Sequence, residues 1–177
     1  RTQMIKTRYK IQEYFSKETK IHCNRVEQYT KAMAEELRLS AYDTKMLTVA
    51  ARYHDIGKYY IPEKILNAPR PLTGLERKVI DMHAYEACME YGLEKDICEL
   101  ILLHHGTHKY RTLTDEQISD FAKEYFQILM AADIYDALIS DRVYRRAMDH
   151  DRALDIVAEN PEIKRWVFLA LEKISLC

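Results

Sequence analysis

The sequence contains little of what β-structure and tight turns require. Its 177 residues include only four glycines and four prolines, and β-branched residues seldom occur in alternating runs. Because strands show apolar–polar alternation and hairpins need turn-forming residues, this scarcity argues against a β-sheet fold. The length suits one domain with a sizeable core. We therefore expect an all-α fold and a single domain over residues 1–177.

Paired cysteines are also missing. The chain has four cysteines, and none of them stands in a CxxC pair. A disulfide framework or a cysteine zinc site normally shows closely paired cysteines. We therefore expect reduced thiols and a cytoplasmic protein.

The chain lacks both an excess of charge of one sign and a long hydrophobic run. It has 27 Lys and Arg against 28 Asp and Glu, a net charge of −1. This balance argues against a general DNA or RNA binder and against a polybasic membrane binder. No apolar run approaches the roughly 20 residues that cross a bilayer, and no signal peptide is visible. The first residue is Arg1, which is compatible with a piece cut from a longer protein that carries a sensor domain.

Hydrophobic periodicity predicts a bundle of about seven helices. The expected ranges are 8–37, 41–56, 73–91, 95–105, 114–140 with room for a break, 149–159, and a last helix that starts at 160–161. Ser40 is a suitable N-cap, and Thr73-x-x-Glu76 has the pattern of a capping box. Pro161 suits the first position of the last helix.

Five of these helices place an ionisable residue on or beside their apolar stripe. In the first helix, steps of three or four residues from Phe15 reach Glu18, His22 and Val26. Glu18 and His22 therefore share the face that should be buried. The other helices contribute His54, His83, His104, His105 and Asp133.

Each of these residues alone has an ordinary explanation, such as a core histidine bonded to a carbonyl or a histidine that closes a helix. Together with Asp55 they make eight. Burial of ionisable groups is costly unless they are paired or bind metal, and such a set fits oxygen and nitrogen ligation. It contains no cysteine, which disfavours a structural zinc site. Three carboxylates and five imidazoles suit two or three Fe or Mn ions, with Zn or Ni left open.

The order of these residues resembles the HD superfamily of metal-dependent phosphohydrolases, and more narrowly the HD-GYP family of cyclic-dinucleotide phosphodiesterases. The matching segments, within about residues 22–146, are HDIGKYYIPEKIL, PRPLTGLERKVIDMH, LLHH and MAADIYDALISDRVYR. The dipeptide HD alone is a weak signal, whereas HDIGK followed by HH and the last segment is a strong one. The resemblance implies an HD-type helical bundle.

The resemblance also implies the roles of individual residues. Asp55 is the implied bridge between metals and a catalytic residue. Lys58 is the implied second catalytic residue, which meets a substrate phosphate. Arg142 and Arg145 are the implied further substrate-binding residues. The implied metal ligands are Glu18, His22, His54, Asp55, His83, His104, His105 and Asp133.

One loop departs from the family. HD-GYP members normally continue the HH pair with glutamate and then a Gly-Tyr-Pro segment, but this chain reads HHGTHKYRTL. Gly106 replaces the glutamate, and the tripeptide is missing. We therefore expect an intact metal centre beside an altered substrate pocket.

The leading hypothesis is a metal-dependent phosphodiesterase that hydrolyses a cyclic dinucleotide, with cyclic di-GMP as the first candidate. The reaction would use a hydroxide held between two metals about 4 Å apart. Two alternatives stay open. One is an HD phosphohydrolase for another nucleotide, and the other is a non-catalytic signalling module that keeps its metals as structure. A homodimer is also left open.

Overall fold

The computed structural model describes residues 16–60, 69–106, 113–142 and 145–176, and these residues form an all-helical fold. They contain no strand, and an isolated antiparallel bridge joins Arg142 and Arg145. The expected all-α class is therefore confirmed. The seven α-helices in these ranges are α2 (Lys17–Glu36), α3 (Ala41–Tyr53), α5 (Gly74–Glu90), α6 (Lys95–Leu103), α7 (Asp120–Ile139), α8 (His150–Glu159) and α9 (Arg165–Ser175), and two 3-10 helices are η1 (His54–Tyr60) and η3 (Asp115–Gln117).

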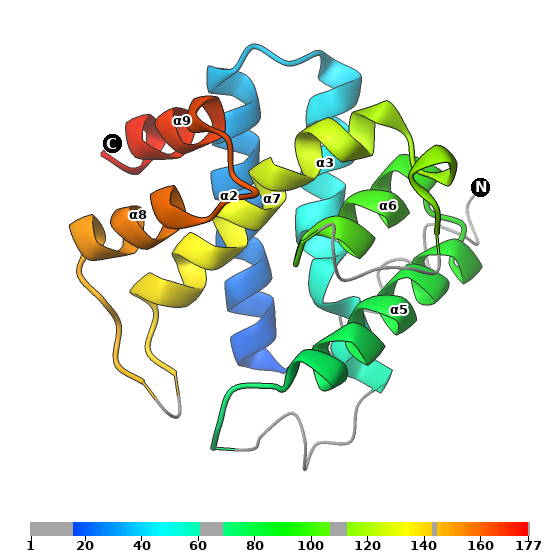
Figure 1. Ribbon diagram of the computed structural model, residues 1–177, viewed down its shortest axis with the longest axis horizontal. Coiled ribbons are helices and arrows are strands. Elements are labelled where there is room, and N and C mark those ends of the chain that lie inside the picture. Colours follow the sequence, from blue (N-terminus) through cyan, green and yellow to red (C-terminus); the bar gives the residue numbers. More distant parts are fainter. Residues whose placement is uncertain (1–15, 61–68, 107–112, 143–144, 177) are drawn as a thin grey trace.

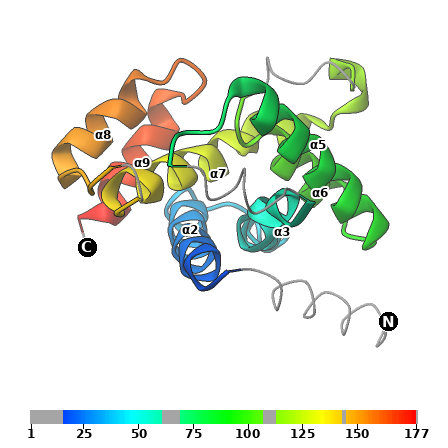
Figure 2. The ribbon, with the colours of Figure 1, turned by 90° about the horizontal axis from the view of Figure 1, so that it is seen from below.

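Helices α2 and α3 run antiparallel at the centre of the fold, and α7 crosses them (Figure 1). Helices α5 and α6 lie on the side of α3, whereas α8 and α9 lie on the side of α2 (Figure 2). The central helices therefore meet helices from both halves of the chain. Residues that are far apart in the sequence are thus brought together along α2 and α7.

The core consists of the apolar stripes that the periodicity predicts. Val26 and Met33 on α2, Leu47 on α3, Leu100 on α6 and Leu129 on α7 are fully buried. Burying such a side chain stabilises the fold by about 1.5–3 kcal/mol, which is why these stripes fix how the helices pack. No helix in the described ranges combines the length and the apolar character that a membrane crossing needs.

Most of the expected helix starts are confirmed. The Ser40 side chain accepts a hydrogen bond from the N–H of Asp43 at 3.0 Å. Thr73 and Glu76 form the predicted capping box. The break expected in 114–140 is present, because η3 is followed by a new helix that begins at Asp120. The expected part of the first helix before residue 16 lies outside the described residues.

Two predicted boundaries are wrong. The second helix ends at Tyr53, and the chain tightens into the 3-10 helix η1 before the predicted end at residue 56. The last helix begins at Arg165 and not at 160–161. There the Asn160 side chain accepts a hydrogen bond from the N–H of Glu162 at 2.9 Å, and the Asn160 carbonyl accepts one from Ile163 at 3.1 Å. Asparagine bonded to its own local backbone favours a turn over a helix start.

Candidate metal centre

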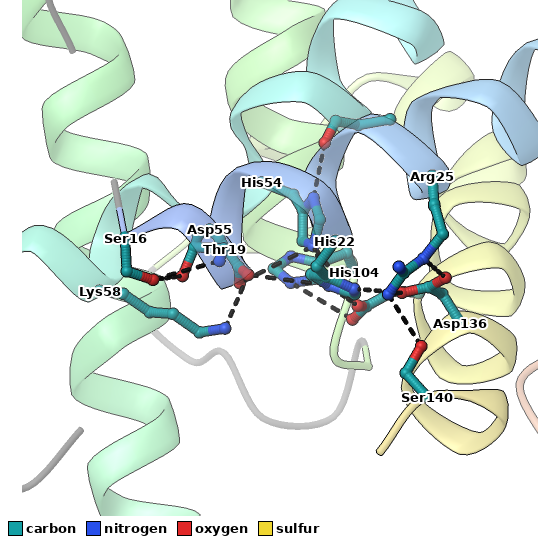
Figure 3. A network of polar contacts seen from close by, with 12 residues as sticks. Ser16, Thr19, His22, Arg25, His54, Asp55, Lys58, His104, Asp136 and Ser140 are labelled. Atoms are coloured by element: carbon teal, nitrogen blue, oxygen red, sulfur yellow. Dashed lines mark hydrogen bonds and ion pairs between the residues drawn. The ribbon is translucent and has the colours of Figure 1, made fainter. Parts of the chain in front are cut away.

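Four parts of the chain converge on one buried point (Figure 3). Helix α2 brings His22, and the junction between α3 and η1 brings His54 and Asp55. The C-terminus of α6 brings His104, and α7 brings Asp133. The sequence predicted all five as metal ligands, and the structure gathers all five.

The imidazoles of His22 and His54 contact the Asp133 carboxylate directly. His22 Nε2 lies 2.9 Å from Asp133 Oδ1 and 3.2 Å from His54 Nε2. His54 Nε2 lies 3.3 Å from Asp133 Oδ1. His104 Nε2 approaches the other oxygen, Oδ2, at 4.0 Å. Three Nε2 atoms from three different helices or helix ends therefore surround one carboxylate.

The opposite nitrogen of each of these rings is held by an acceptor outside the cluster. His54 Nδ1 donates to the Ala51 carbonyl at 2.6 Å, and His104 Nδ1 donates to the Ile101 carbonyl. Carbonyl oxygens can only accept, so both Nδ1 atoms carry the proton. His22 Nδ1 lies 2.7 Å from a carboxylate oxygen of Asp136 and donates to it in the same way. All three rings therefore turn Nε2 toward the cluster, as ligands of a metal ion do.

This arrangement fits a metal ion, because two groups of potential ligand atoms each lie within 4.8 Å of one another. One group is His22, His54 and Asp55, and the other is His54, His104 and Asp133. The two groups share His54, so they form one continuous cluster.

The electrostatics of the cluster also suit a cation. Burial would raise the pKa of Asp133, but the charge of His54 and hydrogen bonds from His22 and His54 hold that pKa well below its usual range. Burial would lower the pKa of His22, yet the hydrogen bonds to Asp133 and Asp136 outweigh it and raise that pKa. The carboxylates therefore stay ionised and draw positive charge into the site. Protons on the imidazoles would leave when a metal ion takes their place.

Asp55 is paired with Lys58 on η1. Lys58 Nζ lies 2.6 Å from Asp55 Oδ2, and that oxygen lies 3.7 Å from His22 Nε2. Burial would raise the pKa of Asp55, but the charges of Lys58, His54 and His22 outweigh it and lower the pKa. The Lys58 side chain is 23% exposed, so its ammonium lies between the buried carboxylate and solvent.

Three predicted ligands lie outside the two groups. His105 borders the cluster, with Nε2 3.6 Å from Asp133 Oδ2. The His83 side chain on α5 is 43% exposed and lies 3.8 Å from Glu86. Glu18 is exposed in the first turn of α2, one turn before His22. Their roles as metal ligands stay predictions.

The two predicted substrate-binding arginines occupy the turn after α7. The N–H of each bonds to the carbonyl of the other, from Arg142 to Arg145 at 2.7 Å and back at 3.2 Å. The Arg145 guanidinium donates to the carbonyl oxygens of Ala137 and Leu138, at 2.6 and 3.1 Å. Arg145 thus caps the last turn of α7, where carbonyls lack helical partners.

The residues on the Nδ1 side of His22, away from the cluster, were not predicted from the sequence. Asp136 is a buried acceptor for His22, and it is bonded to Arg25, which also contacts Ser140. A signal was available, since Arg25 follows His22 by three residues and Asp136 follows Asp133 by three. On a helix this spacing places each pair on one face.

The glycine that replaces the family's glutamate after the HH pair lies in the left-handed region of backbone conformation. Gly106 has a φ of 119°, in the region that favours glycine. The glutamate that HD-GYP members carry there would be strained in this conformation. Residues 107–112, which include the rest of the altered segment up to Arg111 and Thr112, lie outside the described residues.

Comparison with known proteins points to the same family. The family model described as HD domain matches residues 7–164. A Vibrio cholerae serotype O1 protein named 3′3′-cGAMP-specific phosphodiesterase 3 is 36% identical over 93% of this chain and 37% of its own length. A second protein of that organism, named cyclic di-GMP phosphodiesterase, is 33% identical over 80% of this chain and 32% of its own length. The chain thus spans about a third of the curated relatives that it matches.

A solved structure shows the same fold. The crystal structure of the L. monocytogenes phosphodiesterase PgpH HD domain in complex with cyclic-di-AMP superposes with a TM-score of 0.59 and 18% identity. The superposition covers 88% of this chain and 86% of that one. The expected HD-type bundle is confirmed. The fold, the converging histidines and aspartates, and the match over residues 7–164 together show that this chain belongs to the HD domain family.

Proposed function

We propose that this chain is the hydrolytic domain of a metal-dependent phosphodiesterase that cleaves a cyclic dinucleotide. The observation that carries the proposal is the set of three imidazoles whose Nε2 atoms face the Asp133 carboxylate. The named activities of the two Vibrio cholerae relatives support the class of substrate.

The buried cluster would hold two divalent ions. Fe or Mn suits a set of imidazoles and carboxylates without sulfur. When bound, such ions lower the pKa of a coordinated water and draw charge from phosphoryl oxygens. A third ion would need the outlying side chains Glu18, His83 and His105. The residues that would hold the first two ions are His22, His54, Asp55, His104 and Asp133.

The reaction adds water across one P–O bond of the ring. The water oxygen bonds to phosphorus, and the ribose oxygen leaves with a proton, which yields a linear dinucleotide. A second cut would yield mononucleotides. We assign Lys58 to the phosphate, because its ammonium borders both Asp55 and solvent. Arg142, at the end of α7, is the candidate for a further phosphate contact, because arginine binds phosphate with two parallel hydrogen bonds.

Cyclic di-GMP is the first candidate substrate, as the motifs imply. The relative with 36% identity favours 3′3′-cGAMP as the second candidate. Both contain guanine and the same phosphodiester ring, so the metal cluster itself does not discriminate between them. We expect the altered segment after Gly106 to determine which of these two substrates is hydrolysed.

The test combines metal analysis with product detection. The protein loaded with Mn or Fe is incubated with cyclic di-GMP, 3′3′-cGAMP, cyclic di-AMP and simple nucleotides, and the products are separated by chromatography. We expect about two or three ions per chain, as two-metal sites imply, and cleavage of one cyclic dinucleotide. His54→Ala should lose both the metal and the turnover. His150→Ala, on α8 beside Tyr135, is the matched control and should keep both.

Other outcomes would redirect the assignment. Bound metal with cleavage of a simple nucleotide alone would favour the HD phosphohydrolase of different specificity. Bound metal without any turnover would favour the signalling module. No bound metal would overturn the proposal, since every step depends on the cluster.

A further inference from the structure

Asp136 and Arg25 form a carboxylate–guanidinium pair directly behind His22 (Figure 3). The Asp136 side chain is 0% exposed. Arg25 Nε donates to Asp136 Oδ1 at 2.6 Å, and Arg25 Nη2 donates to Oδ2 at 3.2 Å. Nη2 also donates to Ser140 Oγ at 2.8 Å. The guanidinium is therefore anchored at two points of α7, one turn apart.

Arg25 leaves one oxygen of the Asp136 carboxylate accessible to His22. Oδ2 of Asp136 accepts from His22 Nδ1 at 2.7 Å, while Oδ1 is occupied by Arg25. Because Arg25 contacts both oxygens, it sets the plane of the carboxylate. An ionised carboxylate accepts hydrogen bonds and donates none, so the proton of the neutral ring sits on Nδ1.

Helices α2 and α7 supply two of the predicted metal ligands and also the residues that hold His22 in place. His22 and Arg25 lie three residues apart on α2, and Asp133 and Asp136 lie three residues apart on α7. As a result His22 lies between two aspartates of α7, with Nε2 toward Asp133 and Nδ1 toward Asp136. The ring cannot turn over without losing both contacts.

We propose that Asp136, held by Arg25, is a positioning residue that fixes His22 in the tautomer and orientation that bind metal through Nε2. This inference rests on the metal site of the proposed function. It does not depend on which nucleotide is hydrolysed. Supports of this kind typically change metal affinity by about 10–100-fold when they are lost.

Asp136→Asn gives the sharpest test, because asparagine has the shape of aspartate but only one acceptor oxygen in place of two. The amide has one oxygen, and Arg25 Nε and His22 Nδ1 would compete for it. The shorter contact, 2.6 Å, belongs to Arg25. The amide NH₂ would then face His22 Nδ1 and favour the opposite tautomer, with the proton on Nε2 where the metal should bind.

Removal of Arg25 should end the competition between Arg25 and His22 for the amide oxygen. In the double variant Arg25→Met with Asp136→Asn, the amide oxygen is free to accept from His22 Nδ1. We therefore expect the double variant to bind metal more tightly than Asp136→Asn alone. A residue that merely fills space would not produce this rescue, since two losses would add or worsen each other.

The experiment measures the dissociation constant for Mn²⁺ with a competing chelator in the full chain. Asp136→Asn should weaken binding by about 10–100-fold, and the double variant should recover at least part of that loss. Asp120→Asn, fully exposed at the start of the same helix, is the matched control and should bind as the wild type does. Thermal unfolding of the metal-free proteins shows whether each variant is folded.

Two results from the variants would overturn the inference while leaving the proposed function intact. The first is wild-type affinity in folded Asp136→Asn, and the second is a double variant that binds no better than the single one. The wild type provides a test that needs no variant. In the zinc-loaded chain, nitrogen NMR should show His22 protonated at Nδ1, and a proton at Nε2 would overturn the inference. If the wild type binds no divalent ion, the proposed function itself fails.

Discussion

Gly57 lies so close to Ile80 that a Cβ at position 57 would stand 2.1 Å from the Ile80 carbonyl oxygen and 2.9 Å from Ala84 Cβ. Gly57 belongs to η1, two residues after Asp55, whereas Ile80 and Ala84 belong to α5. The missing side chain therefore lets the 3-10 helix rest directly on α5. This contact sets where Asp55 lies, and it explains why glycine stands in the HDIGK segment.

Gly57→Ala should destabilise the protein by about 1–3 kcal/mol, since the added methyl group meets a backbone carbonyl that cannot turn away. Displacement of η1 should also weaken Mn²⁺ binding. Urea denaturation measures the first effect, and chelator competition measures the second. Gly74→Ala is the matched control, because nothing lies within 4 Å of a Cβ at that position. Equal stability of the two variants would show that η1 does not need this close approach.

Lys58→Met should separate catalysis from metal binding. Its ammonium lies 2.6 Å from Asp55 Oδ2 and is not itself a ligand, so its loss should leave the affinity for Mn²⁺ unchanged or higher. Turnover should fall by about 10²–10³-fold, the usual effect of losing one donor to a developing negative charge. Lys45→Met, exposed on α3, serves as the control. Loss of metal together with Lys58 would mean that the lysine only holds Asp55 in place.

Arg142 and Arg145 should behave differently although they face each other across one turn. Arg145→Met removes donors to the carbonyls of Ala137 and Leu138, so we expect a loss of about 1–3 kcal/mol in urea denaturation. Arg142→Met should change stability by less than about 0.5 kcal/mol and raise KM for the cyclic dinucleotide. The reverse pattern would assign the substrate contact to Arg145.

The start of α5 should respond to acid through Glu76. The Arg70 guanidinium and the Thr73 N–H hold its carboxylate and lower the pKa of Glu76 from its usual 4.5 to about 2. A lowered pKa contributes stability that is fully present above 4.5 and is lost as the pH falls toward 2.

Glu76→Gln keeps an acceptor but removes the charge, so it isolates this contribution. The difference in unfolding free energy between wild type and variant should be constant from pH 7 to about 5 and shrink below that, since the unfolded carboxylate becomes protonated. Denaturant titrations at several pH values measure it. A difference that stays constant down to pH 3 would contradict the role of the charge.

Much of the site could be predicted from single helices. His22, His54 and Asp133 stood out because they interrupt apolar stripes, and stripes depend only on residues three or four apart. The capping box of Thr73 and Glu76 could be found for the same reason. Pro161 led to the wrong prediction of a helix start at 160–161, because proline suits a helix start as well as the turn that Asn160 forms.

The sequence by itself determined the all-helical class, most helix boundaries and several of the ionisable residues that face inward, because these follow from periodicity and capping within a few residues. The tertiary structure alone decided which ring nitrogens face the cluster, that the His83 side chain is 43% exposed, and that Arg145 caps α7. It also decided that Arg25 meets Asp136, 111 residues further along the chain. Such contacts depend on how α2 packs against α7, and that packing is set by the buried stripes of the whole bundle.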